Sequence, residues 1–177
     1  RPQTLEADVV RFQNNKDRWI AFIGLNDGKP YEIFTGMADD EDGILIPRWV
    51  TNGLIIKNKE ADGTSRYDFQ YVNTRGYKTT IEGLSYKFNP EYWNYAKLTS
   101  GTPRHGMPIV SLVDLISSLQ LDENINTWKN GVARALKRYI PDGTQAGKSK
   151  CSNCSGTNLQ YQEGCLTCLD CGNSKCG

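Results

Sequence analysis

Six cysteines are the residues with the clearest chemical potential in this 177-residue sequence, and all of them lie between positions 151 and 176. Their spacing is Cys151-x2-Cys154-x10-Cys165-x2-Cys168-x2-Cys171-x4-Cys176. A secreted domain held by disulfides distributes its cysteines through the fold. C-x-x-C pairs gathered in one short segment are typical instead of a metal site or of thiol redox chemistry in a reducing compartment. The cysteines therefore predict a cytoplasmic protein with a cysteine-rich tail over residues 151–177.

The pairing of the cysteines predicts a zinc ribbon. A C-x-x-C turn presents two thiolates on one side, and two such turns complete a tetrahedral site of four sulfurs, which favours zinc or iron. Residues 159–162 alternate like a strand and Glu163-Gly164 has the composition of a turn, so a hairpin with a C-x-x-C knuckle at each end is expected. Because so short a tail buries little apolar surface, metal binding would supply its stability.

Six thiols are two more than one zinc ion needs, and the sequence allows two divisions. In the first, the two thiols left free are Cys165 and Cys176. Gly156 and Gly172 favour this division, because a knuckle commonly turns through a small residue. The metal ligands are then Cys151, Cys154, Cys168 and Cys171.

In the second division, Cys171 takes no part in the metal site. It forms with Cys176 a mobile C-x4-C pair at the end of the chain, which suits redox exchange. The metal ligands are then Cys151, Cys154, Cys165 and Cys168. Knuckle geometry favours the first division and redox logic the second, so both remain open. Exposed spare thiols are a liability unless they are used, which favours a redox tail over an inert ribbon.

The first half of the chain has the pattern of an antiparallel sheet. Asp27-Gly28 is a hairpin signal, because this pair tolerates the positive φ angles of a type I′ turn. A cluster of polar residues at 14–17 predicts another turn. Aromatic and β-branched residues predict strands within 9–12, 19–25, 31–34, 54–56, 67–71 and 77–81.

Helices are predicted after the strands. Asn89 is a good N-cap and Pro90 suits the first helical position, so 91–98 should be a short helix. Pro108 opens a second helix, and Asp122 or Asn124 caps a third, each with apolar residues at helical spacing. The expected fold class is thus α+β, with an antiparallel β-sheet, about three helices and a zinc-ribbon-like tail. The expected domains are an α+β domain over 1–143, a flexible linker over 144–150 and the tail over 151–177.

The charge balance argues against a dominant nucleic-acid footprint. The chain has 21 basic and 20 acidic residues, and no apolar run is long enough to span a bilayer. A zinc-ribbon module that binds nucleic acid or protein remains the alternative function, although Lys175 is the only basic residue and Tyr161 the only aromatic residue of the tail. A free-standing thiol oxidoreductase is less favoured, because no βαβ pattern surrounds the cysteines. The single histidine, His105, is expected in a surface loop.

The tail resembles the C-terminal cysteine-rich domain of class II ribonucleotide reductases, which use adenosylcobalamin. The residues that carry this resemblance are the six cysteines together with Asn158-Leu159, Glu163-Gly164, Gly172 and Ser174-Lys175. Ser152 and Ser155 stand where that family usually has proline and glycine. Upstream the resemblance is weaker and covers Arg1-Pro2, 19–24, Asp27-Gly28 and 31–34, with 38–86 as an apparent insertion and without the family's Thr-Ser-Cys-Pro-Asp-like motif.

The resemblance implies a role in reductase turnover. Such a reductase oxidises a cysteine pair in its catalytic barrel at each turnover, and a C-terminal dithiol re-reduces that disulfide by thiol exchange. Cys171 and Cys176, or alternatively Cys165 and Cys176, would be this relay pair. The implied partners are the catalytic barrel, a neighbouring subunit and a small-protein or other dithiol reductant, with neither membrane nor nucleic acid. Because the radical, substrate and adenosylcobalamin sites belong to the barrel, the chain alone is expected to be inactive.

Overall fold

The computed structural model describes residues 1–13, 17–38 and 44–176, so the predicted turn at 14–17 lies largely outside the described residues. Contacts divide the chain into two compact units, Arg1–Gly106 and Met107–Gly177, which we call the sheet unit and the tail unit. The expected domain boundaries were at 143 and 150. In the structure, the helical residues after Gly106 belong to the same compact unit as the cysteines.

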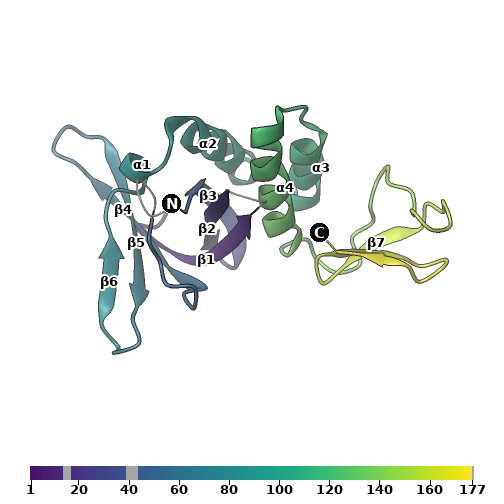
Figure 1. Ribbon diagram of the computed structural model, residues 1–177, viewed down its shortest axis with the longest axis horizontal. Helices are drawn as coiled ribbons and strands as arrows, with labels where there is room; N and C mark the ends of the chain where they lie inside the picture. The colour runs from purple at the N-terminus through teal and green to yellow at the C-terminus, as the bar shows by residue number, and fades with distance from the viewer. Residues whose placement is uncertain (14–16, 39–43, 177) are drawn as a thin grey trace. The chain divides into compact units, whose positions relative to one another are not determined.

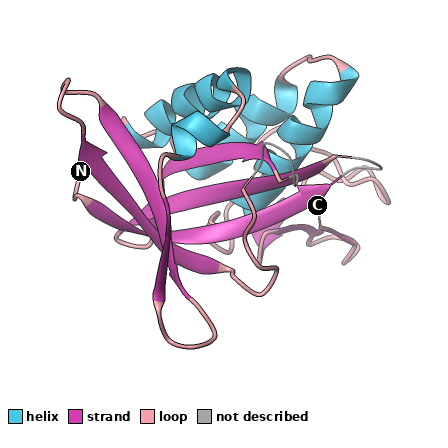
Figure 2. Cartoon of the chain, turned by 60° about the vertical axis from the view of Figure 1, so that its left-hand side comes forward, coloured by secondary structure: helices cyan, strands magenta, loops and turns pink. Residues whose placement is uncertain are grey.

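The sheet unit is built on a six-stranded antiparallel sheet (Figures 1 and 2). The strand order is β3-β2-β1-β4-β5-β6. The strands are β1 (Thr4–Gln13), β2 (Arg18–Asn26), β3 (Lys29–Met37), β4 (Asn52–Lys59), β5 (Ser65–Val72) and β6 (Lys78–Ile81). Each strand segment that the sequence predicts coincides with one of these six strands, and Tyr77 alone lies just before its strand, β6.

The hairpin between β2 and β3 has the predicted turn. Asp27 and Gly28 have φ angles of 51° and 73°, which are the two positive values that a type I′ turn requires. The second half of the sheet comes from the stretch 38–86 that the sequence suggested as an insertion. It supplies β4, β5 and β6 and joins the sheet through pairing of β4 with β1, in a register that sets Leu5 opposite Ile55.

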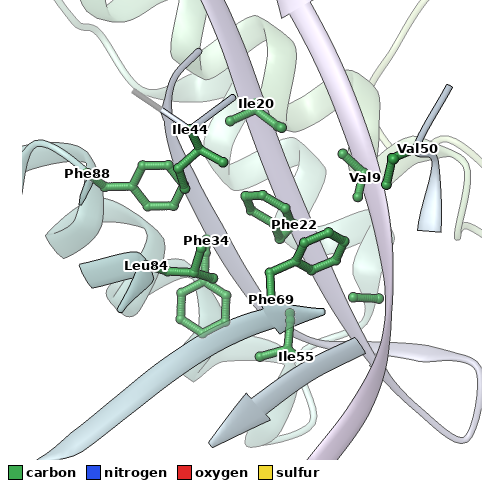
Figure 3. Close-up of a cluster of buried hydrophobic side chains, with 11 residues drawn as sticks. Val9, Ile20, Phe22, Phe34, Ile44, Val50, Ile55, Phe69, Leu84 and Phe88 are labelled. Carbon is green, nitrogen blue, oxygen red and sulfur yellow. The ribbon is translucent and has the colours of Figure 1, made fainter. Parts of the chain in front are cut away.

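The core of the sheet unit is a cluster of apolar side chains on one face of the sheet (Figure 3). Phe22 from β2 and Phe69 from β5 are fully buried, with ring centroids 4.6 Å apart. On β5, Phe69 is buried, Tyr67 and Tyr71 are half-buried, and the polar Asp68 beside Phe69 is buried as well. Distant strands are therefore joined by one continuous apolar cluster.

Two helices belong to the sheet unit. The short α1 (Leu84–Lys87) was not predicted, and α2 (Pro90–Arg104) lies against β3 (Figure 1). The Asn89 side chain caps α2 by accepting from the N–H of Glu91 at 2.9 Å, as the N-cap assignment requires. The helix runs past the expected end at 98, because Ser100 is anchored on β3: its hydroxyl accepts from the N–H of Ile33 at 2.9 Å.

The tail unit begins with two helices, α3 (Ile109–Ser118) and α4 (Glu123–Lys137). Pro108, predicted to open the first of them, stands at the N-cap of α3, and Asp122, one of the two predicted caps, stands at the N-cap of α4 without a side-chain cap hydrogen bond. Leu112, Val113 and Ile116 of α3 are buried, as are Trp128, Val132 and Leu136 of α4. The α+β class is thereby confirmed, with four helices among the described residues. None of these helices has the length and apolar character that crossing a membrane requires.

The tail unit ends in a three-stranded antiparallel sheet of order β7-β8-β9. Its strands are β7 (Leu159–Gln162), β8 (Cys165–Cys168) and β9 (Ser174–Lys175), drawn in yellow tones in Figure 1. Glu163 and Gly164 form the turn between β7 and β8, with φ angles of 50° and 78°. The predicted hairpin over 159–166 is therefore present, and a third short strand follows it.

Candidate metal and thiol-redox centre

The first pair of thiols lies on a tight turn that starts at Cys151. The N–H of Ser155 donates to the carbonyl of Cys151 at 2.9 Å, and Ser155 itself has a positive φ of 60°. The sequence suggested Gly156 as the turning residue, but Ser155 adopts the left-handed conformation. Gly156 is required because a larger side chain would not fit at this position. A Cβ on Gly156 would lie 2.8 Å from a carboxylate oxygen of Asp170 and 3.1 Å from the Sγ of Cys154.

The second pair of thiols lies on an equivalent turn at the end of β8. The N–H of Gly172 donates to the carbonyl of Cys168 at 2.9 Å, and Gly172 has a φ of 75°. In both turns the left-handed residue follows the second cysteine directly. Two copies of one local geometry therefore present Cys151 with Cys154, and Cys168 with Cys171.

The two turns bring four sulfur atoms together. The Sγ atoms of Cys151, Cys154, Cys168 and Cys171 all lie within 4.8 Å of one another. The Cys151–Cys171 and Cys154–Cys168 distances are both 3.6 Å. A tetrahedral site with metal–sulfur bonds of about 2.3 Å requires sulfur atoms roughly 3.8 Å apart. These four thiols therefore fit a metal ion, with Cys151 and Cys168 buried and the other two exposed.

Amide groups around the cluster are aimed at the sulfurs. The N–H of Asn153 lies 3.4 Å from the Sγ of Cys151, and the side-chain amide of Asn153 donates to the Sγ of Cys171 at 3.5 Å. This side-chain donor lowers the pKa of Cys171. Asn153 was not singled out from the sequence, although an amide side chain inside a C-x-x-C turn is well placed to stabilise a thiolate.

The pKa values of Cys151 and Cys154 shift in opposite directions. The backbone N–H of Cys154 is the main cause that lowers the pKa of Cys151 from 9.0 to about 6. For Cys154 the N–H of Gly156 favours the thiolate, yet neighbouring thiols, first that of Cys168, raise its pKa to about 12. Sulfurs this close cannot all become thiolates without a counter-charge. A bound cation would supply that charge and deprotonate the remaining thiols.

The remaining two cysteines form a disulfide, Cys165–Cys176, with Cα atoms 4.3 Å apart. The pairing follows from the register of β8 and β9, in which Leu166 lies opposite Lys175 and Thr167 opposite Ser174. One step further along the same register, Cys165 faces Cys176. A cross-strand pair of this kind has its Cβ atoms close enough for a disulfide.

The disulfide and the metal-binding thiols are separated by the strand geometry. Successive side chains of a β-strand point to opposite faces, so Cys165 and Cys168 project from opposite faces of β8. Cys165 is half-buried and Cys176 is exposed. The tail thus carries four clustered thiols and one accessible disulfide that does not share the cluster's sulfurs.

The structure brings together the thiols of the first of the two divisions. Cys165 lies outside the four-sulfur cluster, and Cys171 lies inside it rather than beside Cys176. His105 is exposed and follows the last residue of α2 as its C-cap, in the connection between α2 and α3 where the sequence predicts a surface loop.

The segment expected as a flexible linker is hydrogen-bonded to the cysteine tail over its first residues. The N–H of Tyr161 donates to the carbonyl of Thr144 at 2.8 Å, and the N–H of Ala146 donates to the carbonyl of Leu159 at 3.0 Å. Ala146, Leu159 and Tyr161 are all buried. The side chain of Asp142 also accepts from the N–H of Glu163 at 2.7 Å. These contacts fix β7, and with it the thiols, to the chain that follows α4.

Comparison with known proteins assigns the larger part of the chain to a protein family. A family model described as the NrdJ homologue C-terminal domain matches residues 5–141. No curated protein and no solved structure matches the chain. The match covers more than half of the sequence and ends before the first cysteine, so the chemistry of the tail rests on its own geometry. The chain belongs to the NrdJ homologue C-terminal domain family, a C-terminal domain related to ribonucleotide reductase.

Proposed function

We propose that this chain is the C-terminal region of a B12-dependent ribonucleotide reductase and carries reducing equivalents to its active site. NrdJ is the class II, B12-dependent reductase, and a relation to it supports a reductase as the parent protein. The parent would convert ribonucleotides to deoxyribonucleotides for DNA synthesis in the cytoplasm. Its adenosylcobalamin and substrate would bind in the catalytic barrel, and this chain alone would be inactive.

The relay would use Cys165 and Cys176. As thiols, the pair would reduce an active-site disulfide: two electrons and two protons pass to the active-site sulfurs, and a Cys165–Cys176 disulfide forms. An external dithiol, from a small protein or another reductant, would return the pair to thiols and leave as its own disulfide. The observation that carries this proposal is the Cys165–Cys176 disulfide beside an intact four-thiol cluster.

Zinc is the metal we propose for the cluster formed by Cys151, Cys154, Cys168 and Cys171. Four thiolates in a tetrahedral arrangement suit this ion, which has no redox chemistry to compete with the disulfide. Its role would be structural. It would hold the two knuckles together and so keep β8 and β9 in the register that sets Cys165 opposite Cys176.

The experiment compares single and multiple turnover in the full-length reductase with a protein dithiol as reductant. The double variant Cys165→Ser/Cys176→Ser should still form about one product per pre-reduced active site, because the barrel chemistry is intact. Multiple turnover should be lost. Ser149→Ala/Ser152→Ala is the matched control, since it changes two exposed serines near the cysteines and should leave turnover unchanged. Undiminished multiple turnover in the double cysteine variant would refute the relay.

The alternative of a nucleic-acid-binding ribbon gains no support from the tail. Tyr161, its single aromatic residue, is only 5% exposed, so its ring is not available to stack on a base. The single basic residue, Lys175, leaves the tail without a patch that could contact several phosphates.

A further inference from the structure

The sheet unit contains a pocket of about 570 Å³ that plays no part in the thiol chemistry. It lies between one face of α2 and the hairpin that joins β4 and β5, with Gly63, Thr64 and Ser65 on the hairpin side. Its volume is within the range of small-molecule sites.

One end of the pocket is aromatic. Trp93 of α2 stacks on Phe34 of β3, with ring centroids 5.0 Å apart and planes 23° apart. Tyr67 of β5 packs on Phe34 at 5.0 Å and lies 6.1 Å from Trp93. Trp93 and Tyr67 are half-buried, and both line the pocket. Such a group of rings suits a planar aromatic ligand.

The wall along α2 is cationic. Trp93, Lys97, Ser100 and Arg104 follow one another at helical spacing and line the pocket from a single face of α2. At about 1.5 Å per residue, Lys97 lies roughly 6 Å and Arg104 roughly 16 Å along the helix axis from Trp93. None of the described residues that line the pocket carries a carboxylate. The pocket therefore has two positive charges along α2, those of Lys97 and Arg104, at increasing distance from the aromatic rings.

Contacts with Glu32 and Tyr31 fix the position of the Arg104 side chain. Its guanidinium donates to the buried Glu32 at 3.1 Å and to the carbonyl of Tyr31 at 3.2 Å, and it stacks over the Tyr31 ring at 4.9 Å. Glu32 is also paired with Arg1, so this one carboxylate is shared by two arginines and does not neutralise both. A guanidinium that is held in position, and whose positive charge is only partly neutralised, is well suited to bind phosphate oxygens.

We propose that this pocket binds a nucleoside di- or triphosphate. The base would stack against Trp93 and Tyr67, and the phosphates would lie along α2 on Lys97 and Arg104. Ser65 and Ser85, which also line the pocket, offer hydroxyl groups to the sugar. An apolar peptide would leave the positive charge of Lys97 without a counter-charge, and a simple anion would leave the rings without a contact, so a ligand that joins a planar ring to several negative charges fits best.

The test measures binding of ADP, adenosine and pyrophosphate to the 177-residue chain by calorimetry. ADP should bind one per chain, and adenosine and pyrophosphate should each bind at least tenfold more weakly, because each satisfies only one end of the pocket. Lys97→Glu should weaken ADP binding by at least tenfold, the effect of one lost charge-assisted contact. Lys97 is exposed, so circular dichroism should show an unchanged fold.

Lys29→Glu is the matched control, since Lys29 is an equally exposed lysine at the start of β3 that does not line the pocket. It should bind ADP as the unaltered chain does. Equal losses in the two variants would show general charge attraction and overturn the proposal, as would a failure of ADP to bind at millimolar concentration. Because no cysteine takes part, either result is independent of the thiol relay.

Discussion

At the scale of single residues, the thiols differ in what protects them. In reduced, metal-loaded protein the Sγ atoms of the cluster should be shielded by the metal, whereas Cys165 and Cys176 carry no such protection. Brief treatment with iodoacetamide, followed by mass mapping, should therefore label these two quickly and the other four slowly. Oxidised metal-loaded protein is the control and should label none. Fast labelling of Cys171 together with Cys176 would select the other division of the thiols.

Asn153 should tune the pH at which the metal is released. Its side-chain amide lowers the pKa of Cys171, so the thiolate persists to lower pH than an ordinary thiol allows. Metal binding needs the thiolate, and protons compete with the metal as the pH falls towards that lowered pKa. Asn153→Ala removes the donor and raises the pKa of Cys171. The midpoint of metal release, followed with a chromophoric chelator, should then move to higher pH, whereas Ser152→Ala should leave it in place.

At the scale of elements, the strands of the tail depend on the metal and the helices do not. β8 and β9 are short and hold few buried apolar side chains, while α3 and α4 bury apolar residues of their own and supply no ligand thiol. Removal of the metal by a chelator should therefore abolish the hydrogen-exchange protection of the Cys168 and Gly172 amides, which bond within the knuckle. The amides of α4 should stay protected. Loss of protection in both at once would mean that the tail unit unfolds as a whole.

At the scale of the whole molecule, two compact units with separate cores should unfold separately. Phe69 is fully buried in the core of the sheet unit, and Phe69→Ala should cost that unit about 3–5 kcal/mol. Calorimetry should show one transition moving to lower temperature while metal content is unchanged. Chelation of the unaltered protein should shift the other transition. A single transition that responds to both changes would show that the units are coupled.

The sequence by itself determined the features that depend on neighbouring residues. Asp27-Gly28 specifies its hairpin because these two residues tolerate positive φ, and Asn89-Pro90 starts a helix through a local cap. The spacing of the cysteines likewise places thiols in pairs on tight turns. In each case a few consecutive residues carry the whole physical cause.

Only the tertiary structure decided the features that depend on pairing between distant segments. β9 has two residues, too few for a pattern, yet its register on β8 sets Cys165 opposite Cys176 and leaves Cys171 in the turn beside the other thiols. Pairing of 143–146 with β7 similarly joins the first residues of the expected linker to the tail, through backbone hydrogen bonds that composition does not reveal. The end of α2 was also decided by a distant contact, that of Ser100 with β3. Backbone hydrogen bonds between segments carry little trace in side-chain type, and the division of the six thiols depends on them.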